Sequence, residues 1–384
     1  MIMSKLEQLI QELCPNGVEW IELGNILEYE QPTKYIVEST DYDQSYNIPV
    51  LTAGQTFILG YTNERTGIYT ASSANPTIIF DDFTTAFHWV DFDFKVKSSA
   101  MKMLRPKVTF KGLFRYIYYA MKCIGYEAVD HSRHWISKYS HFEIPIPPLP
   151  VQEEIVRILD AFTSHAAELQ AELQARREQY EYYRNKLLSF EDDSSVEWKK
   201  LGEIGSVCMC KRIMKDQTNS TYGIPFYKIG TFGKTADSYI SPDLYEDYKK
   251  RFSFPRKGEI LISASGTIGR SVIYNGEDAY FQDSNIVWLR NEETIVLNKY
   301  LYYCYQIIDW NVEGGTIKRL YNNSIINTEI PIPPLSEQRR IVAILDKFEA
   351  LVNDLTEGLP AEIAARQEQY EYYRDKLLNF PKAV

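Results

Sequence analysis

Twelve residues of this chain occur in two nearly identical copies: QYEYYRNKLLSF at 179–190 and QYEYYRDKLLNF at 369–380. The copies differ only at two positions, where Asn185 and Ser189 in the first become Asp375 and Asn379 in the second. In a chain of 384 residues, one copy lies at the middle and the other at the end. A repeat at this spacing indicates that the chain consists of two related halves.

Longer repeats surround this motif. IPIPPLPVQEEIVRILDAF at 144–162 returns as IPIPPLSEQRRIVAILDKF at 330–348, and VEWIELGNI at 18–26 returns as VEWKKLGEI at 196–204. Each half therefore contains a globular segment, a Pro-rich hinge and a long helix. The predicted segments are a globular domain with an N-terminal helix at 1–144, a hinge and helix at 145–190, a second globular domain at 191–330, and a hinge and helix at 331–384.

Both long segments carry apolar residues at heptad spacing, from Ile155 to Leu187 and from Ile341 to Leu377. A helix of about 38 residues, roughly 57 Å long, is too long to pack on one small core. We therefore expect the two helices to pair antiparallel as a coiled coil. The second copy has four extra residues around Gly358 and Pro360, which predicts a stutter and a kink or short break.

The first helix also contains a tetrapeptide repeat, AELQAELQ at 167–174. Each copy adds about one helical turn, roughly 6 Å, and duplex DNA rises about 3.4 Å per base pair. If both globular domains contact DNA, this stretch sets the gap between them. Otherwise it is helix-forming sequence without a further role.

The two globular segments are each predicted to be mixed α/β (α+β) domains, arranged as a pseudo-twofold repeat. Short runs rich in β-branched and aromatic residues predict strands. Those strands are expected at 48–54, 57–62, 77–83, 91–96 and 100–104, and at 224–230, 259–266, 271–276 and 286–290. Short helices are expected at 112–124 and 297–308.

Composition indicates an ordinary globular, cytoplasmic protein. Hydrophobic residues make up 45% and charged residues 24% of the chain. The N-terminus has no apolar run of the kind a signal peptide needs, and no stretch approaches about 18 consecutive apolar residues. The cysteines form no CxxC pair, which predicts reduced thiols: Cys14, Cys123, Cys208, Cys210 and Cys304.

The charge distribution leaves the kind of partner open. A net charge of −10 argues against nucleic acid, but the acidic excess lies mainly on the repeated hinge-and-helix segments. From Lys95 to Arg115 seven basic residues occur without an acidic one. Such a run could follow a phosphate backbone. A solvated face of strands and loops is an equally good interpretation.

Catalytic motifs are missing from the sequence. GTFGKT at 230–235 has two residues between its glycines where a phosphate-binding loop has four, and SASGTIGR at 263–270 lacks the dinucleotide-binding spacing. The aspartates at 81, 82, 91 and 93 could suggest a metal site, but no nuclease pattern follows them. These observations argue against an enzyme in its own right and favour a recognition protein.

Loops with amide, hydroxyl and basic side chains are candidates for reading base edges and holding phosphates, although for any single residue a role in a turn is the alternative. In the first domain the candidates are Gly54, Gln55, Tyr61, Asn63, Arg65, Thr84, Thr85, His88, Ser98, Lys102, Arg105 and Arg133. In the second they are Lys228, Thr231, Lys234, Ser263, Ser265, Thr267, Arg270, Gln282, Asn285, Lys318 and Arg319.

The two Pro-rich segments, the two QYEYYR helix ends and the tetrapeptide repeat together resemble the specificity subunits of type I restriction-modification systems, in particular the type IC subgroup. The resemblance covers essentially the whole chain. It implies two target-recognition domains, each reading one half of a bipartite, asymmetric DNA sequence. It also implies that two modification subunits bind the helical regions to form an adenine-N6 methyltransferase, and that two restriction subunits add translocation and cleavage.

On this resemblance the chain carries no catalytic, cofactor or metal site, and the partner subunits bind S-adenosylmethionine, ATP and Mg²⁺. The four-residue difference between the helices implies that the two partner sites are not strictly symmetric. The expected partner-binding residues are Pro147, Pro148, Tyr180, Tyr183, Arg184, Pro333, Pro334, Tyr370, Tyr373 and Arg374. The alternative is an adaptor without DNA contact, a coiled-coil rod that presents two protein-binding domains, which the overall negative charge favours.

Overall fold

The computed structural model describes residues 5–54, 56–128, 132–190, 194–314, 318–354 and 356–383. The chain folds into two compact units, one formed by Met1–Gln170 with Ile363–Val384 and the other by Ala171–Glu362. Each unit therefore combines one globular segment with part of the helical segments. The long helix α5 (Leu149–Leu188) contributes residues to both units.

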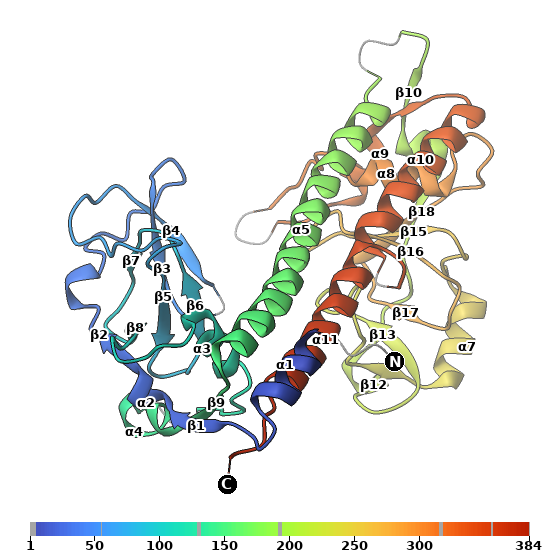
Figure 1. The fold of residues 1–384 in the computed structure, drawn as a ribbon. Coiled ribbons are helices and arrows are strands. Elements are labelled where there is room, and N and C mark those ends of the chain that lie inside the picture. The colour runs from blue at the N-terminus through green and yellow to red at the C-terminus, as the bar shows by residue number, and fades with distance from the viewer. Residues whose placement is uncertain are drawn as a thin grey trace. The chain divides into compact units, whose positions relative to one another are not determined.

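The first unit contains two sheets (Figure 1). The antiparallel sheet has the order β2 (Leu27–Glu30), β8 (Met101–Pro106), β5 (Thr77–Asp81), β6 (Phe87–Val90). The other has the order β4 (Ile58–Thr62), β3 (Ile48–Leu51), β7 (Lys95–Val96), with β3 and β7 parallel. The predicted strands are confirmed, except that the one expected at 91–96 is reduced to β7, and β2 and β6 were not predicted.

The helices of the first globular part are short. They are α1 (Lys5–Leu13), α2 (Leu23–Ile26), α3 (Phe114–Met121) and α4 (His134–Ser137), with 3-10 turns η1 (Thr33–Tyr35) and η2 (Tyr139–His141). Helix α3 confirms the helix expected at 112–124. Its Tyr116 is fully buried and donates a hydrogen bond to the carbonyl oxygen of Pro145 at 2.9 Å, so burial and polar satisfaction together hold α3 against the hinge.

The second unit repeats this topology. Its antiparallel sheet has the order β11 (Ser206–Cys208), β18 (Ile286–Arg290), β15 (Ile260–Ser263), β16 (Ser271–Ile273). Its other sheet has the order β12 (Thr218–Asn219), β14 (Tyr239–Ile240), β13 (Ile224–Tyr227), β17 (Tyr280–Phe281), with β13 and β17 parallel as β3 and β7 are. The pseudo-twofold repeat expected from the sequence thus extends to the strand order.

The helices of the second globular part are α6 (Leu201–Ile204), η3 (Lys215–Gln217), α7 (Pro242–Arg251), α8 (Asn298–Tyr305) and α9 (Asn322–Asn327). Helix α8 confirms the helix expected at 297–308. Helix α7 was not predicted, although its start is marked in the sequence. The hydroxyl of Ser241 accepts the Leu244 N–H at 3.3 Å, and Pro242 occupies the first turn.

The repeated motifs at the start and end of each globular part pair with each other. Strand β1 (Glu19–Glu22) is antiparallel to β9 (Glu143–Ile146), and β10 (Glu197–Lys200) is antiparallel to β19 (Glu329–Ile332). In both pairs a tryptophan lies opposite a hinge proline, Trp20 opposite Pro145 and Trp198 opposite Pro331. These two ribbons close each globular part at the hinge, a pairing that the sequence did not predict.

Both long helices predicted from the heptad spacing are present. Helix α5 is one unbroken helix of 40 residues, whereas α10 (Leu335–Asn353) ends before α11 (Leu359–Leu377) begins, which confirms the predicted break near Gly358. In the first unit Phe162 of α5 stacks on Tyr373 of α11 at 5.6 Å. In the second, Tyr183 of α5 stacks on Phe348 of α10 at 5.8 Å. Each copy of the hinge helix therefore packs on the other copy's QYEYYR motif.

The cysteines and the hydropathy of the helices can also be read from the structure. All five cysteines are free thiols, as predicted, and Cys14, Cys210 and Cys304 are buried. No helix within the described ranges is long and apolar enough to cross a membrane.

Candidate nucleic-acid interface

Three loops of the first unit meet at one end of its sheets. They are the β3–β4 loop (52–57), the β5–β6 loop (82–86) and the β7–β8 loop (97–100). The Lys97 N–H donates to the Leu51 carbonyl at 3.1 Å, and the Asp82 N–H donates to the Ala100 carbonyl at 2.9 Å. These bonds join the end of β7 to the end of β3 and the start of β8 to the end of β5, so the three loops form one surface, called here the first loop surface.

The second unit builds the same surface from corresponding loops: β13–β14 (228–238), β15–β16 (264–270) and β17–β18 (282–285). The Gln282 N–H donates to the Tyr227 carbonyl at 2.9 Å, and the Ala264 N–H donates to the Asn285 carbonyl at 2.7 Å. We call this the second loop surface. Because the strand order is repeated, two loop surfaces follow from one topology, and they differ in loop length and in side chains.

Many of the predicted DNA contacts lie on these two surfaces. The first carries Gly54, Thr84, Thr85 and Ser98, and Arg133 lies beside it because the adjacent His134 N–H donates to the Asp82 carbonyl at 2.8 Å. The second carries Lys228, Thr231, Lys234, Ser265, Thr267, Arg270, Gln282 and Asn285, with Arg319 bridged to Ser265 and Lys318 next to it. Gln55 lies outside the described residues.

Three of these predictions are wrong because the side chains are enclosed. Lys102 is 1% exposed and forms an ion pair with Asp82 at 3.0 Å, so its ammonium cannot reach a phosphate. Ser263 is also 1% exposed and its hydroxyl donates to the Thr267 carbonyl. Thr85 is buried in a left-handed backbone conformation (φ 59°), and its hydroxyl donates to the Thr84 carbonyl at 2.7 Å. Each of these side chains stabilises its loop through contacts inside the protein.

Four other predicted contacts lie away from the loops or are engaged elsewhere. Tyr61 is on β4, and Asn63 and Arg65 follow that strand where it pairs with the start of β3, at the opposite end from the first loop surface. The guanidinium of Arg105 donates to the Thr70 carbonyl at 3.3 Å and lies 4.9 Å from the Tyr69 ring. These four side chains do not join the first loop surface.

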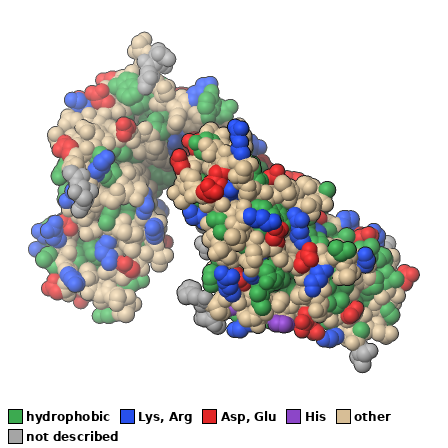
Figure 2. Space-filling model, turned by 90° about the vertical axis from the view of Figure 1, so that its left-hand side faces the viewer, with side chains coloured by type: hydrophobic (Ala, Val, Ile, Leu, Met, Phe, Trp, Pro, Cys, Tyr) green, Lys and Arg blue, Asp and Glu red, His purple; other side chains and the backbone are tan. Residues whose placement is uncertain are grey.

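The run of basic residues from Lys95 to Arg115 does not form a common surface either. Lys95 is 3% exposed and pairs with Glu64 at 2.6 Å, the Lys107 ammonium donates to the Gly24 carbonyl at 2.6 Å, and Arg115 pairs with Asp160 at 2.8 Å. On the face drawn in Figure 2, basic and acidic side chains are interspersed. Residues along a strand alternate between faces, so a basic run in sequence need not become a basic stripe.

His88, at the start of β6, also belongs to the first loop surface. Its ring stacks on Phe57 at 4.6 Å, and Nε2 is 3.2 Å from the Gly54 carbonyl oxygen. Burial lowers the pKa of His88 below its ordinary value. The imidazole is therefore neutral near pH 7 and offers shape and a hydrogen bond rather than charge.

Three of the four candidate aspartates of the first unit, Asp81, Asp82 and Asp93, are engaged in hydrogen bonds or an ion pair. Asp81 accepts the backbone N–H groups of Phe83 and Thr84 at 2.9 and 2.8 Å, which makes it a turn-forming residue. Asp93 accepts the Ala71 N–H at 3.0 Å. No group of three or more potential metal ligands occurs in the part of the chain that the structure describes.

A hollow of about 390 Å³ opens on the second loop surface, lined in part by Lys228, Gln282, Ser284 and Asn285. Its remaining wall comes from residues that the sequence analysis did not single out, Arg212 to Lys215 and Asp283 among them. Arg212 pairs with Asp283 at 2.8 Å. The basic segment CKRIMK at 210–215 was the available signal.

Several of the predicted partner-binding residues on the helices make contacts inside their own unit. Tyr180 is buried, and both its hydroxyl and the Arg184 guanidinium donate to the side-chain oxygen of Gln306 at 3.1 Å. Arg374 pairs with Asp375 at 2.7 Å, and Tyr370 packs against the core of the first unit. Pro147 and Pro333 are buried at the hinges, whereas Pro148 and Pro334 are exposed.

The most exposed aromatic residues of the helical repeat were missed. Tyr182 is 60% and Tyr372 62% exposed, and they are the same position in the two copies of QYEYYR. Each lies edge-on to the following tyrosine, Tyr183 or Tyr373, at 5.3 Å. We call these the two tyrosine pairs. Because Tyr182 and Tyr372 expose aromatic surface on the helix, the two pairs are candidates for contact with a partner.

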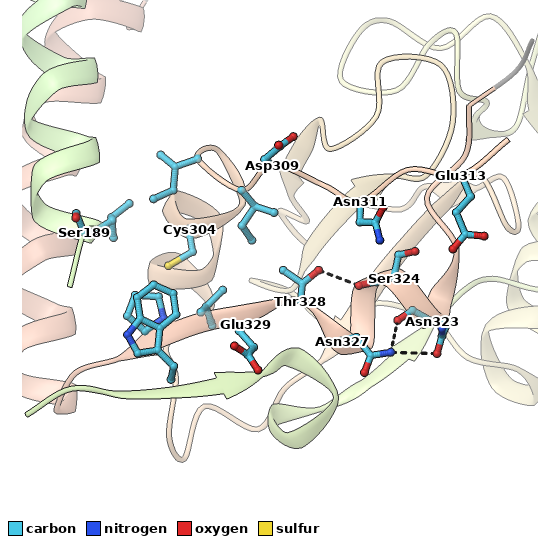
Figure 3. A pocket seen from close by; sticks show the side chains of 16 residues that line it. Ser189, Cys304, Asp309, Asn311, Glu313, Asn323, Ser324, Asn327, Thr328 and Glu329 are labelled. Carbon is cyan, nitrogen blue, oxygen red and sulfur yellow. Dashed lines mark hydrogen bonds between the residues drawn. The ribbon is translucent and has the colours of Figure 1, made fainter. Parts of the chain in front are cut away.

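Another hollow of the second unit, of about 560 Å³, lies elsewhere (Figure 3). Cys304, Asn311, Glu313 and Asn323 are among its lining residues, and it shares none with the hollow on the second loop surface. The Thr328 hydroxyl at its wall donates to the Ser324 carbonyl at 2.8 Å. None of the predicted site residues lines it.

Comparison with known proteins agrees with this double construction. The sequence profile of the type I restriction modification DNA specificity domain matches the chain twice, at 15–178 and 194–365. The type I restriction enzyme EcoR124I/EcoR124II specificity subunit of Escherichia coli is 44% identical, with 99% of this chain and 98% of that protein covered. A putative type I specificity subunit of Haemophilus influenzae is 45% identical, with 98% of each covered.

Solved structures show the same fold at low sequence identity. The S subunit of a type I restriction-modification system from Mycoplasma genitalium superposes with a TM-score of 0.55 at 14% identity, covering 94% of this chain and 96% of that one. A chain from a study of type I system assembly gives 0.59 at 20% identity, covering 96% and 98%. With two profile matches that span most of its length, the chain belongs to the family of type I restriction-modification specificity subunits.

Proposed function

We propose that the chain recognises a bipartite, asymmetric DNA site, with each loop surface reading one half-site, and thereby directs adenine-N6 methylation or restriction by its partners. The observation that carries this proposal is the duplicated topology that builds two loop surfaces with different side chains. The first offers a neutral His88 with Ser98 and Arg133, whereas the second offers amides and bases around Gln282 and Asn285. Two unlike surfaces suit two unlike half-sites.

The helices would then have two tasks, to set the spacing of the two half-sites and to dock two modification subunits. The two tyrosine pairs support the docking role, since they place the same exposed aromatic group once in each unit. The second copy is divided into α10 and α11, whereas α5 is continuous, so the two docking sites would be related without being identical.

Catalysis would reside on those partners. In this arrangement the modification subunits bind S-adenosylmethionine and transfer the methyl group, and restriction subunits, where present, use ATP and Mg²⁺. The chain itself would act as a non-catalytic specificity subunit whose side chains select the base sequence.

Deleting Ala171–Gln174 tests the spacing role. This removes one turn of α5, which is roughly 6 Å of helix, and should shorten the spacer while both half-sites keep their sequence. The measurement is methylome sequencing of cells that supply the modification partner. Glu172→Gln is the matched control, because it changes an exposed side chain of the same turn without changing helix length.

The competing interpretation is the adaptor without DNA contact, which the net charge of −10 favours. It predicts that no methylated motif depends on the chain even where the modification partner is confirmed to be present. A dependent motif whose spacer ignores the deletion would retain the DNA-reading role and exclude the helix as the determinant of spacing.

A further inference from the structure

Asn285, the last residue of the β17–β18 loop, has its side-chain oxygen fully engaged. Its Oδ1 accepts the Ser265 hydroxyl at 2.9 Å and the Arg319 guanidinium at 2.9 Å. A guanidinium has only donors, so the atom that faces it must be the carbonyl oxygen of the amide. The two bonds therefore fix which way the amide points.

The backbone around Asn285 is held as firmly as its side chain. Ser284 adopts a left-handed conformation (φ 54°), and Arg319 donates a second bond to its carbonyl oxygen at 3.3 Å. The carbonyl of Asn285 accepts the Ala264 N–H at 2.7 Å. Because the backbone and Oδ1 are both engaged in hydrogen bonds, the amide nitrogen Nδ2 is the only polar atom of this side chain that remains available to bind a ligand.

Gln282, at the other end of the same loop, also has its side-chain oxygen engaged, by one hydrogen bond. Its Oε1 accepts the Ile229 N–H at 3.0 Å, which leaves Nε2 as a donor. Among the described residues neither amide nitrogen has an acceptor partner. Both side chains line the hollow of the second loop surface together with Lys215 and Lys228, which are also donors.

Asp283, which also lines this hollow, pairs through Oδ2 with Arg212 at 2.8 Å. Asn285 and Gln282 therefore each offer the hollow an amide nitrogen as a donor, and the oxygen of Asn285 already accepts two hydrogen bonds. In the major groove, guanine offers two acceptors, N7 and O6, whereas the amino groups of adenine and cytosine need an acceptor. The usual bidentate contact of Asn with adenine requires a free carbonyl oxygen, which Asn285 lacks.

We infer that Asn285 and Gln282 read a guanine in the half-site recognised by the second unit, and that Ser265 and Arg319 are positioning residues that enforce this choice by occupying Oδ1. This inference rests on the proposed DNA-reading function and deepens it. It names a base at one position and assigns the selectivity to the orientation of an amide.

The test is methylation of a library in which each base of both half-sites is randomised, using the full chain with its modification subunits. For the unaltered chain one position of one half-site should require guanine. Asn285→Ala and Gln282→Ala should each lower the guanine preference there by about tenfold or more, which corresponds to losing one good base contact. The other half-site should be unchanged, which shows that the chain is folded and assembled.

The double variant S265A/R319M gives a sharper result. It frees Oδ1, so Asn285 can both accept and donate, and adenine should become accepted at the guanine position. Adding Asn285→Ala should abolish that gain. Lys318→Met, which removes a neighbouring exposed cation, is the control and should weaken methylation equally for all bases.

The outcomes separate the two proposals. If the unaltered chain directs a bipartite motif whose bases are indifferent to all of these substitutions, or if no guanine is required in the half-site that responds, the inference about Asn285 is overturned and DNA reading stands. If the chain directs no motif at all, both are overturned.

Discussion

The buried ion pair between Lys102 and Asp82 offers a quantitative test of how the first loop surface is held. The side chains are 1% and 2% exposed and their charged atoms are 3.0 Å apart. Asp82 also accepts the Trp135 N–H through Oδ1 at 2.8 Å, and its carbonyl accepts the His134 N–H at 2.8 Å. One residue thus joins β8, the β5–β6 loop and the segment that carries Arg133.

Replacing Lys102 with Met should be strongly destabilising. It fills similar volume but leaves the Asp82 carboxylate buried without its countercharge, which costs about 3–5 kcal/mol. The double variant D82N/K102M should be more stable than K102M alone. Its neutral amide can still accept the Trp135 N–H, so the remaining cost is one buried unsatisfied donor, about 1–3 kcal/mol. The second mutation is therefore expected to restore part of the stability that K102M loses.

Hydrogen–deuterium exchange with mass spectrometry on the full chain measures this locally. Peptides that cover β5 and β8 report the opening free energy of this region without requiring the two units to unfold together. Lys34→Met is the control, because its ion pair with Glu30 is exposed and its loss should leave protection of these peptides unchanged. The reasoning is refuted if K102M costs less than about 1 kcal/mol, or if the double variant is no better protected than the single one.

Two further predictions concern the helices. Hydrogen bonds from Arg157 and Lys5 lower the pKa of Glu154 to about 2, so the stability that this carboxylate contributes to the docking of α1 is present above pH 4.5 and is lost as the pH falls towards 2. Exchange of the α1 amides should rise over that interval, and a Glu154→Gln variant should lack the transition. Tyr182→Ala and Tyr372→Ala should each reduce the modification subunits bound per chain from two to one, and the double variant should bind none. Native mass spectrometry counts them, and full occupancy in the double variant would remove the tyrosine pairs from the docking surface.

Much of the fold could be predicted because its signals are local. Heptad spacing along α5 and the residues around Gly358 act within a few turns of helix, so both the long helix and the break before α11 were predicted correctly. Strands such as β5 and β18 are short apolar runs that form wherever a core is available. Strand β6 carries a weaker signal, since two of its four residues are only half-buried.

The candidate site was predicted less completely because exposure depends on distant residues. In the sequence, Lys95 and Lys102 cannot be told apart from Lys97. In the structure, however, Lys95 is enclosed with Glu64 and Lys102 with Asp82, carboxylates that come from other strands or loops. Nothing in the local sequence distinguishes a lysine that will meet a buried aspartate from one that will meet solvent. The missed wall of the second hollow, around Arg212, has the same origin.

The sequence by itself determined that the chain is a duplicated unit with two globular parts and two long helices, because repeats and helical periodicity are properties of neighbouring residues. Only the tertiary structure decided which side chains can act at the loop surfaces. Asn285 presents a donor because Arg319, 34 residues away, holds its oxygen. Burial and hydrogen bonding are set by residues brought together from separate strands, and that convergence exists only in the folded chain.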